Sequence, residues 1–143
     1  MKRLTAAALA LVLVASAAAC GGADTSPFDA TPTGTLVTDT FPGVVQVGGV
    51  DSHNFAITTG GNGISVTLVS AGPPATITMG LGVGTPSSTG GCSILTNGAI
   101  QTPAGTTAQL NGTGFSAGTY CVVVGDIGNA LQPITYTVTV AHT

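Results

Sequence analysis

The sequence of residues 35–143 predicts an all-β domain, an antiparallel β-sandwich of two packed sheets. Three observations lead to this prediction. Apolar and polar residues alternate in several short runs, which is typical of strands with one buried and one wet face. Turn-forming residues separate these runs, among them GPP at residues 72–74 and NG at residues 97–98. No run in this part of the chain is long or charged enough to indicate a helix.

The chain begins with a short basic segment followed by an apolar one. Lys2 and Arg3 precede the apolar residues 4–15, and the small residues 17–19 come next. This order is typical of a secretory signal peptide, whose apolar part is too short to span a membrane in the mature protein. We therefore predict a helical signal peptide at residues 1–19 that is cleaved off.

Cys20 directly follows the small residues of this signal peptide. The pattern resembles the lipobox of bacterial lipoproteins, in which the thiol is diacylated and the chain is cut just before the cysteine. The resemblance implies a lipid-anchored protein of the cell envelope, and Gly21 in place of an aspartate favours the outer membrane. The alternative is an ordinary secretory signal that is cut near Ala19 and leaves Cys20 as a free thiol.

Residues 20–34 (CGGADTSPFDATPTG) are small, polar and turn-forming, and they show no hydrophobic period. We expect this segment to be a flexible tether between the lipid and the domain. A random coil of this length holds its ends a root-mean-square distance of about 20 Å apart.

The strands expected within the domain follow from the alternation. In residues 134–140 (ITYTVTV) the large apolar side chains share one face and the threonines share the other. Residues 120–124 (YCVVV) are apolar on both faces, which predicts a position in the centre of a sheet. Further strands are expected at residues 55–57, 64–68 and 77–83.

The charge balance excludes several classes of partner. Lys2 and Arg3 are the only Lys and Arg residues of the chain, and both lie in the predicted signal peptide. Nucleic-acid binding needs cations that neutralise phosphates, and nucleotide sites use Arg and Lys in the same way. We therefore predict no nucleic-acid and no nucleotide partner. Attachment to the membrane then depends on the acyl chains of Cys20.

Cys92 and Cys121 remain as a pair once Cys20 is assigned to the lipid. Export places them in an oxidising compartment, where paired thiols persist as disulfides. Closing a loop of ~30 residues stabilises a fold by roughly 3 to 4 kcal/mol in the chain-entropy model. A metal or redox pair is the alternative, although the two cysteines lack CxxC spacing and a nearby histidine.

Residues 118–124 (GTYCVVV), followed by residues 136–140 (YTVTV), resemble the end of the bacterial pre-peptidase C-terminal domain. The similarity covers residues 35–142, and its opening strands correspond to residues 43–47, 51–55 and 64–68. The resemblance implies a jelly-roll-like sandwich of about eight strands that aids secretion or binds substrate beside a peptidase. No peptidase domain precedes the module in this sequence, so we expect any such peptidase to be a separate secreted protein.

Some members of that family hold calcium near the start of the module. Calcium takes six to eight oxygen ligands, several of them carboxylates. Asp39 and Asp51 are near the start of the matching region, and Asp126 lies far along the chain. These aspartates and His53 are weak candidates for metal ligands. We expect solvated loop acids and predict no metal and no cofactor.

Asp51, Ser52 and His53 form the one triplet with catalytic side chains. Successive side chains of a strand point to opposite faces, so Ser52 points away from the other two residues and cannot form a serine–histidine relay. We expect Asp51 and His53 to form a hydrogen-bonded pair, with part of a metal site as the alternative. His142 is next to the C-terminus, where disorder is usual. The sequence therefore predicts no enzyme.

Sugar binding usually relies on exposed aromatic faces, and the chain has no Trp. We expect Phe55, Tyr120 and Tyr136 on core faces, whereas Phe41 and Phe115 lie near turns and are candidates for exposure. Calcium-dependent binding of a glycan or a protein is a further alternative.

The predicted edge strands carry no Lys, although edges are usually blunted with charge. We therefore expect edge-strand pairing with a protein partner or an extended peptide. Together these features predict a non-catalytic, lipid-anchored module that acts in binding or in envelope structure. Accessory work beside a separate peptidase is the alternative.

Overall fold

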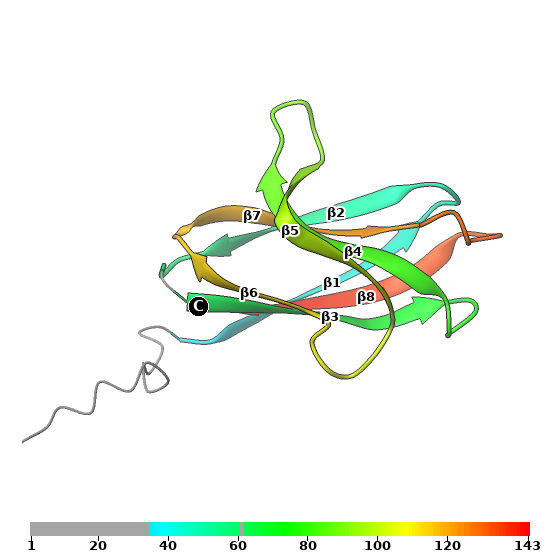
Figure 1. The fold of residues 1–143 in the computed structure, drawn as a ribbon, viewed down its shortest axis with the longest axis horizontal. Helices are drawn as coiled ribbons and strands as arrows, with labels where there is room; N and C mark the ends of the chain where they lie inside the picture. Colours follow the sequence, from blue (N-terminus) through cyan, green and yellow to red (C-terminus); the bar gives the residue numbers. More distant parts are fainter. Residues whose placement is uncertain (1–34, 61) are drawn as a thin grey trace, which may run out of the picture. The chain divides into compact units, whose positions relative to one another are not determined.

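The computed structural model describes residues 35–60 and 62–143, and these residues form an all-β fold without a helix (Figure 1). The predicted signal peptide at 1–19, the lipid site at Cys20 and the tether at 20–34 lie outside the described residues. None of the described segments is a helix of the length and apolar character needed to cross a membrane. The strands are β1 (Val37–Val45), β2 (Val50–Ile57), β3 (Asn62–Gly72), β4 (Thr78–Pro86), β5 (Cys92–Pro103), β6 (Leu110–Phe115), β7 (Gly118–Gly125) and β8 (Ile134–His142).

The strands form two four-stranded antiparallel sheets that face each other (Figure 1). One sheet, sheet A, has the order β1-β8-β3-β6, and the other, sheet B, has the order β2-β7-β4-β5. The chain passes to the other sheet at every connection except the hairpin between β4 and β5. This connectivity is that of a jelly roll, so the predicted antiparallel jelly-roll-like β-sandwich is confirmed.

The two strands with the clearest sequence patterns, β8 and β7, are central strands. β8 pairs with β1 on one side and β3 on the other, and its apolar residues at 134, 136, 138 and 140 are fully buried. β7 lies between β2 and β4, as its double-sided apolar pattern predicts. Each fully buried large aliphatic side chain contributes about 1.5 to 3 kcal/mol. The core between the sheets therefore supplies most of the stability of the domain.

Residues 97–98, which predict a turn, lie inside β5 and form part of a bulge. Ile94 is opposite Gly84 of β4, whereas Ala99 is opposite Gly82, so residues 95–98 have no direct partners in β4. Asn97 adopts a left-handed conformation with φ of 59°. Asn tolerates this conformation, and the NG signal is therefore real although it produces a bulge and not a chain reversal.

The predicted disulfide is present between Cys92 and Cys121, with an S–S distance of 2.01 Å. It joins β5 to β7, and β4 passes between these two strands. Gly84 of β4 makes room for this bridge, because a Cβ there would lie 2.9 Å from Sγ of Cys92 and would overlap the carbonyl of Ser93. The bridge thus crosses β4 at a residue without a side chain.

Candidate functional site

The hydroxyl of Tyr136 joins two side chains of the opposite sheet. Tyr136 lies on β8 and is fully buried, and its hydroxyl donates a 2.9 Å hydrogen bond to Oδ2 of Asp51 on β2. Nε2 of His53 lies 2.8 Å from the same hydroxyl. Because the hydroxyl has one proton, which it donates to Asp51, the Nε2–H of His53 is the donor to Tyr136. Asp51 and His53 share a face as expected, but His53 Nε2 lies 3.7 Å from Oδ2 of Asp51, so the two are joined through the hydroxyl of Tyr136 and not by the direct hydrogen bond that was expected.

Burial raises the pKa of Tyr136 above its ordinary value of 10.0, and the hydrogen bond and charge of Asp51 raise the pKa further. The hydroxyl therefore stays protonated at neutral pH and can act as the donor that this arrangement needs. Ser52 is exposed, on the opposite face of β2 from Asp51 and His53. The three residues do not assemble a serine–histidine relay.

Two expectations about this edge of the sandwich are wrong. Phe41 is not exposed near a turn, because it lies within β1 and its ring stacks on that of His53 at 5.0 Å. His142 is not disordered, since its side chain is buried and its Nε2 lies 3.0 Å from Oδ2 of Asp39. β8 pairs with β1 as far as His142, and this pairing overrides the usual fraying of a chain terminus.

Asp126 is a structural carboxylate that joins two loops. Its Oδ2 accepts a 2.8 Å hydrogen bond from the backbone N–H of Gly48, between β1 and β2. Its Oδ1 accepts hydrogen bonds of 2.9 to 3.0 Å from the N–H groups of Gly128, Asn129 and Ala130, after β7. These backbone donors, with Gly48 first, lower the pKa of Asp126 below its ordinary value of 3.8.

The lowered pKa predicts a pH dependence of stability. A carboxylate that is stabilised in the folded state contributes its stability above its ordinary pKa of 3.8, and this contribution is lost as the pH falls through the lowered value. We expect the melting temperature of the parent protein to fall more steeply, as the pH is lowered below 3.8, than that of the Asp126→Asn variant. Thermal melts in a series of acidic buffers measure both slopes. Equal slopes would contradict the assigned role of Asp126.

The weak candidates for metal ligands lie in three separate places, with only Asp51 and His53 close together, and all of them have other partners. Asp39 contacts His142, Asp51 and His53 contact Tyr136, and Asp126 binds backbone N–H groups. Within residues 35–60 and 62–143, His, Cys, Asp and Glu side chains do not gather in any group of three that could hold a metal ion. The described carboxylates thus act in hydrogen bonds that hold the fold.

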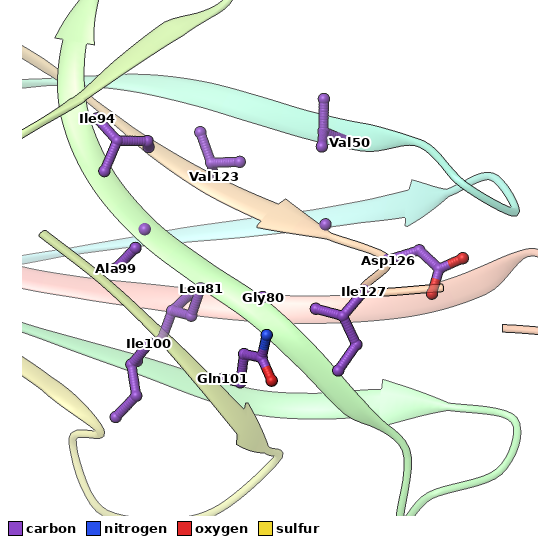
Figure 2. Close-up of a pocket in the computed structure, with 12 residues that line it drawn as sticks. Val50, Gly80, Leu81, Ile94, Ala99, Ile100, Gln101, Val123, Asp126 and Ile127 are labelled. Carbon is purple, nitrogen blue, oxygen red and sulfur yellow. The ribbon is translucent and has the colours of Figure 1, made fainter. Parts of the chain in front are cut away.

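An apolar groove lies on the outer face of sheet B, away from the core (Figure 2). Its volume is about 480 Å³. The floor is β4, where Gly80 and Gly82 alternate with the core residues Met79, Leu81 and Val83. Since glycine has no side chain, the half-buried Gly80 leaves part of the β4 backbone accessible, whereas Gly82 is buried, because the side chain of Ile94 lies where its Cβ would be. The groove follows from this alternation.

Aliphatic side chains form the walls of the groove. Val50, Val123 and Ile127 lie on one side of β4, and Ala99 of β5, which is opposite Gly82, lies on the other (Figure 2). Val50 is 74% exposed and Ile127 is 40% exposed, so these walls present apolar surface to solvent. The one charged side chain at the groove is Asp126, whose carboxylate already accepts backbone hydrogen bonds.

The groove was not predicted from the sequence, although one signal for it was visible. Gly80 and Gly82 fall on the wet face of the predicted strand at 77–83, where polar side chains are usual. Glycines at such positions mark places where another group approaches the backbone closely. The walls come from β2, β5, β7 and the segment after β7, and no local pattern reveals that these meet.

The fold and this groove define the class of the protein, a jelly-roll β-sandwich with an apolar groove on one sheet. No protein-family model matches the chain, and no curated protein matches its sequence.

Proposed function

We propose that this protein is a non-catalytic, lipid-anchored binding module of the cell envelope. Its groove on sheet B takes an extended, uncharged peptide segment of a partner protein. The observation that carries the proposal is the groove itself, with its glycine floor and aliphatic walls. The lipid anchor at Cys20 rests on the sequence of residues 1–20.

The chemistry of the groove favours a peptide with small or aliphatic side chains. Removing the exposed aliphatic walls from water is favourable by about 25 cal/mol per Å² of apolar surface. The half-buried backbone at Gly80, which no side chain of its own covers, allows a second main chain to approach closely. An uncharged segment suits the groove because it offers no Lys or Arg for an acidic ligand and its carboxylate is already bound.

Gly80→Val is the sharpest test of the groove. A Cβ at Gly80 would lie 3.5 Å from both the carbonyl of Gly125 and Cγ2 of Ile127, which is ordinary contact. The β-carbon of a valine is therefore accommodated on β4, and its two methyl groups suit a strand and occupy the floor of the groove. We expect unchanged or higher stability, and a loss of affinity of about tenfold or more for a peptide selected on the parent protein. Peptide display on the Cys20→Ser protein, followed by calorimetry, supplies that peptide and its affinity.

Thr67→Val is the matched control, because it places a valine on β3 of the other sheet. This variant is expected to bind the selected peptide as the parent does. Selection of no peptide, or equal binding by the Gly80→Val variant, would contradict the proposal.

The lipid anchor has its own test. Replacing Cys20 with Ser removes the thiol that carries the acyl chains and leaves residues 35–143 unchanged. We expect the variant to move from the membrane fraction to the soluble fraction, with the same free energy of unfolding as the detergent-solubilised parent protein. A variant that stays in the membrane fraction would show that another part of the chain holds it there.

A further inference from the structure

The register of sheet B places Gln101 beside the accessible backbone of Gly80. Gln101 of β5 is opposite Gly80 in the pairing of β4 with β5, and Gly125 of β7 is opposite Gly80 on the other side. Directly opposed residues of an antiparallel pair point to the same face of the sheet, with Cβ positions about 5 Å apart. The side chain of Gln101 therefore lies on the outer face, next to Gly80 (Figure 2).

The two sides of Gly80 along this row differ in chemistry. On the β7 side, Gly125 is buried, because Cγ1 of Val50 lies 3.0 Å from where its Cβ would be. On the β5 side, the row ends with the exposed side chain of Gln101, since β5 is an edge strand of sheet B. A group that approaches the backbone of Gly80 thus has an apolar side chain on one side and a carboxamide on the other.

The carboxamide of Gln101 is the polar side-chain group of the groove that can bind a ligand. In the part of the chain that the structure describes, it has no hydrogen-bond partner. Asp126, the other polar side chain of the lining, already accepts hydrogen bonds from backbone N–H groups with both of its oxygens. A carboxamide supplies N–H donors and a carbonyl acceptor together.

The main chain of an extended peptide offers the complementary groups. The N–H and C=O of one residue point to the same side of an extended chain, which is why opposed residues of antiparallel strands can exchange two hydrogen bonds. A single carboxamide can form the same two bonds, since its Oε1 accepts from the N–H and its Nε2 donates to the C=O. These bonds are independent of the side chain that the peptide residue carries.

From this arrangement we propose that Gln101 is the specificity-determining residue of the groove, and that its carboxamide hydrogen-bonds to the main chain of a peptide where the peptide passes over Gly80. This inference rests on the proposed function of the groove. The apolar walls alone accept any uncharged apolar molecule of suitable size, whereas a few polar groups in such a site fix the orientation and the identity of the ligand. Gln101 thus selects an extended peptide over other apolar ligands.

Gln101→Leu tests this role, because leucine is similar in size and its side chain has no hydrogen-bonding atoms. Apolar contact alone would make this variant bind the display-selected peptide more tightly than the Cys20→Ser parent does. Loss of the proposed hydrogen bonds is instead expected to weaken binding about fivefold or more, as measured by calorimetry, with an unchanged melting temperature. Gln132→Leu is the matched control, because it makes the same replacement at an exposed residue between β7 and β8 that does not line the groove. This control is expected to bind the peptide as the parent does.

Ester analogues of the selected peptide show whether the contact is to the main chain. An ester in place of one amide removes a single N–H and leaves every side chain of the peptide unchanged. At one position the ester is expected to weaken binding to the parent about threefold or more and to have no effect on Gln101→Leu, which a double-mutant cycle reads as coupling. Equal or tighter binding by Gln101→Leu, or equal ester effects on both proteins at every position, would overturn the role of Gln101, while weaker binding by Gly80→Val would still support the groove. Selection of no peptide would overturn the groove and the role of Gln101 together.

Discussion

Replacing Gly43 with alanine is expected to lower the free energy of unfolding by about 3 kcal/mol, although it adds only one methyl group. Gly43 lies directly opposite Tyr136 in the pairing of β1 with β8. A Cβ at this position would overlap the hydroxyl of Tyr136 and Oδ2 of Asp51. Tyr136 is fully buried and cannot retreat, so β1 must move and lose its pairing.

Urea denaturation measures this effect, and Gly118→Ala is its matched control. Gly118 is also a strand glycine, but the nearest atom to its Cβ would be a ring carbon of Tyr120 at 3.9 Å. The control variant is therefore expected to keep or gain stability, because alanine loses less conformational entropy on folding. An unchanged free energy of unfolding for Gly43→Ala would contradict the close approach at Tyr136.

Tyr136→Phe in the Gly43→Ala background separates the clash from other effects of the methyl group. Removing the hydroxyl takes away one of the atoms that the new Cβ overlaps. The second substitution is thus expected to cost less in the alanine background than in the parent, which a double-mutant cycle reads as a coupling energy. Additive effects would show that the hydroxyl is not what excludes a side chain at residue 43.

The sequence predicts much of the sandwich because side-chain alternation is local. β8 is an example, since the residues that face the core can be identified from the seven residues of its alternating run. The partners of Tyr136 could not be found in this way. Asp51 and His53 are 85 and 83 residues away in the chain, and they meet its hydroxyl only because β2 and β8 face each other across the sandwich.

The expectation of edge-strand pairing depends on which strands lie at the sheet edges, and only the three-dimensional structure identifies them. The missing Lys residues led us to expect open edges, but three of the four edges carry other features that hinder pairing. β1 contains Pro42, β5 is interrupted by its bulge, and β6 has only six residues. β2 is the edge with continuous register against its neighbour β7. Edge-strand pairing with a partner therefore stays a prediction, and β2 is where we place it.

Replacing both Cys92 and Cys121 with alanine is expected to lower the free energy of unfolding by about 3 to 4 kcal/mol. The two cysteines are 29 residues apart in the chain, and their bridge restricts the unfolded state accordingly. The bridge also acts on the native state, because it fixes the start of β5 to β7 across Gly84. Ile94, which lines the groove, follows Cys92 by two residues.

Urea denaturation of the Cys20→Ser protein, with and without a reducing agent, measures the stabilising contribution of the disulfide without interference from a third thiol. Reduction is expected to lower the stability of the parent to that of the double-alanine variant and to leave the variant unchanged. The bridge at Cys92 holds the nearby Ile94 in place in the parent protein. The variant, which lacks the bridge, is therefore also expected to bind the groove peptide more weakly, even under conditions where it is fully folded. Weaker stability with unchanged peptide affinity would show that pairing with β4 alone positions this wall, and equal stability of variant and parent would contradict the role of the bridge.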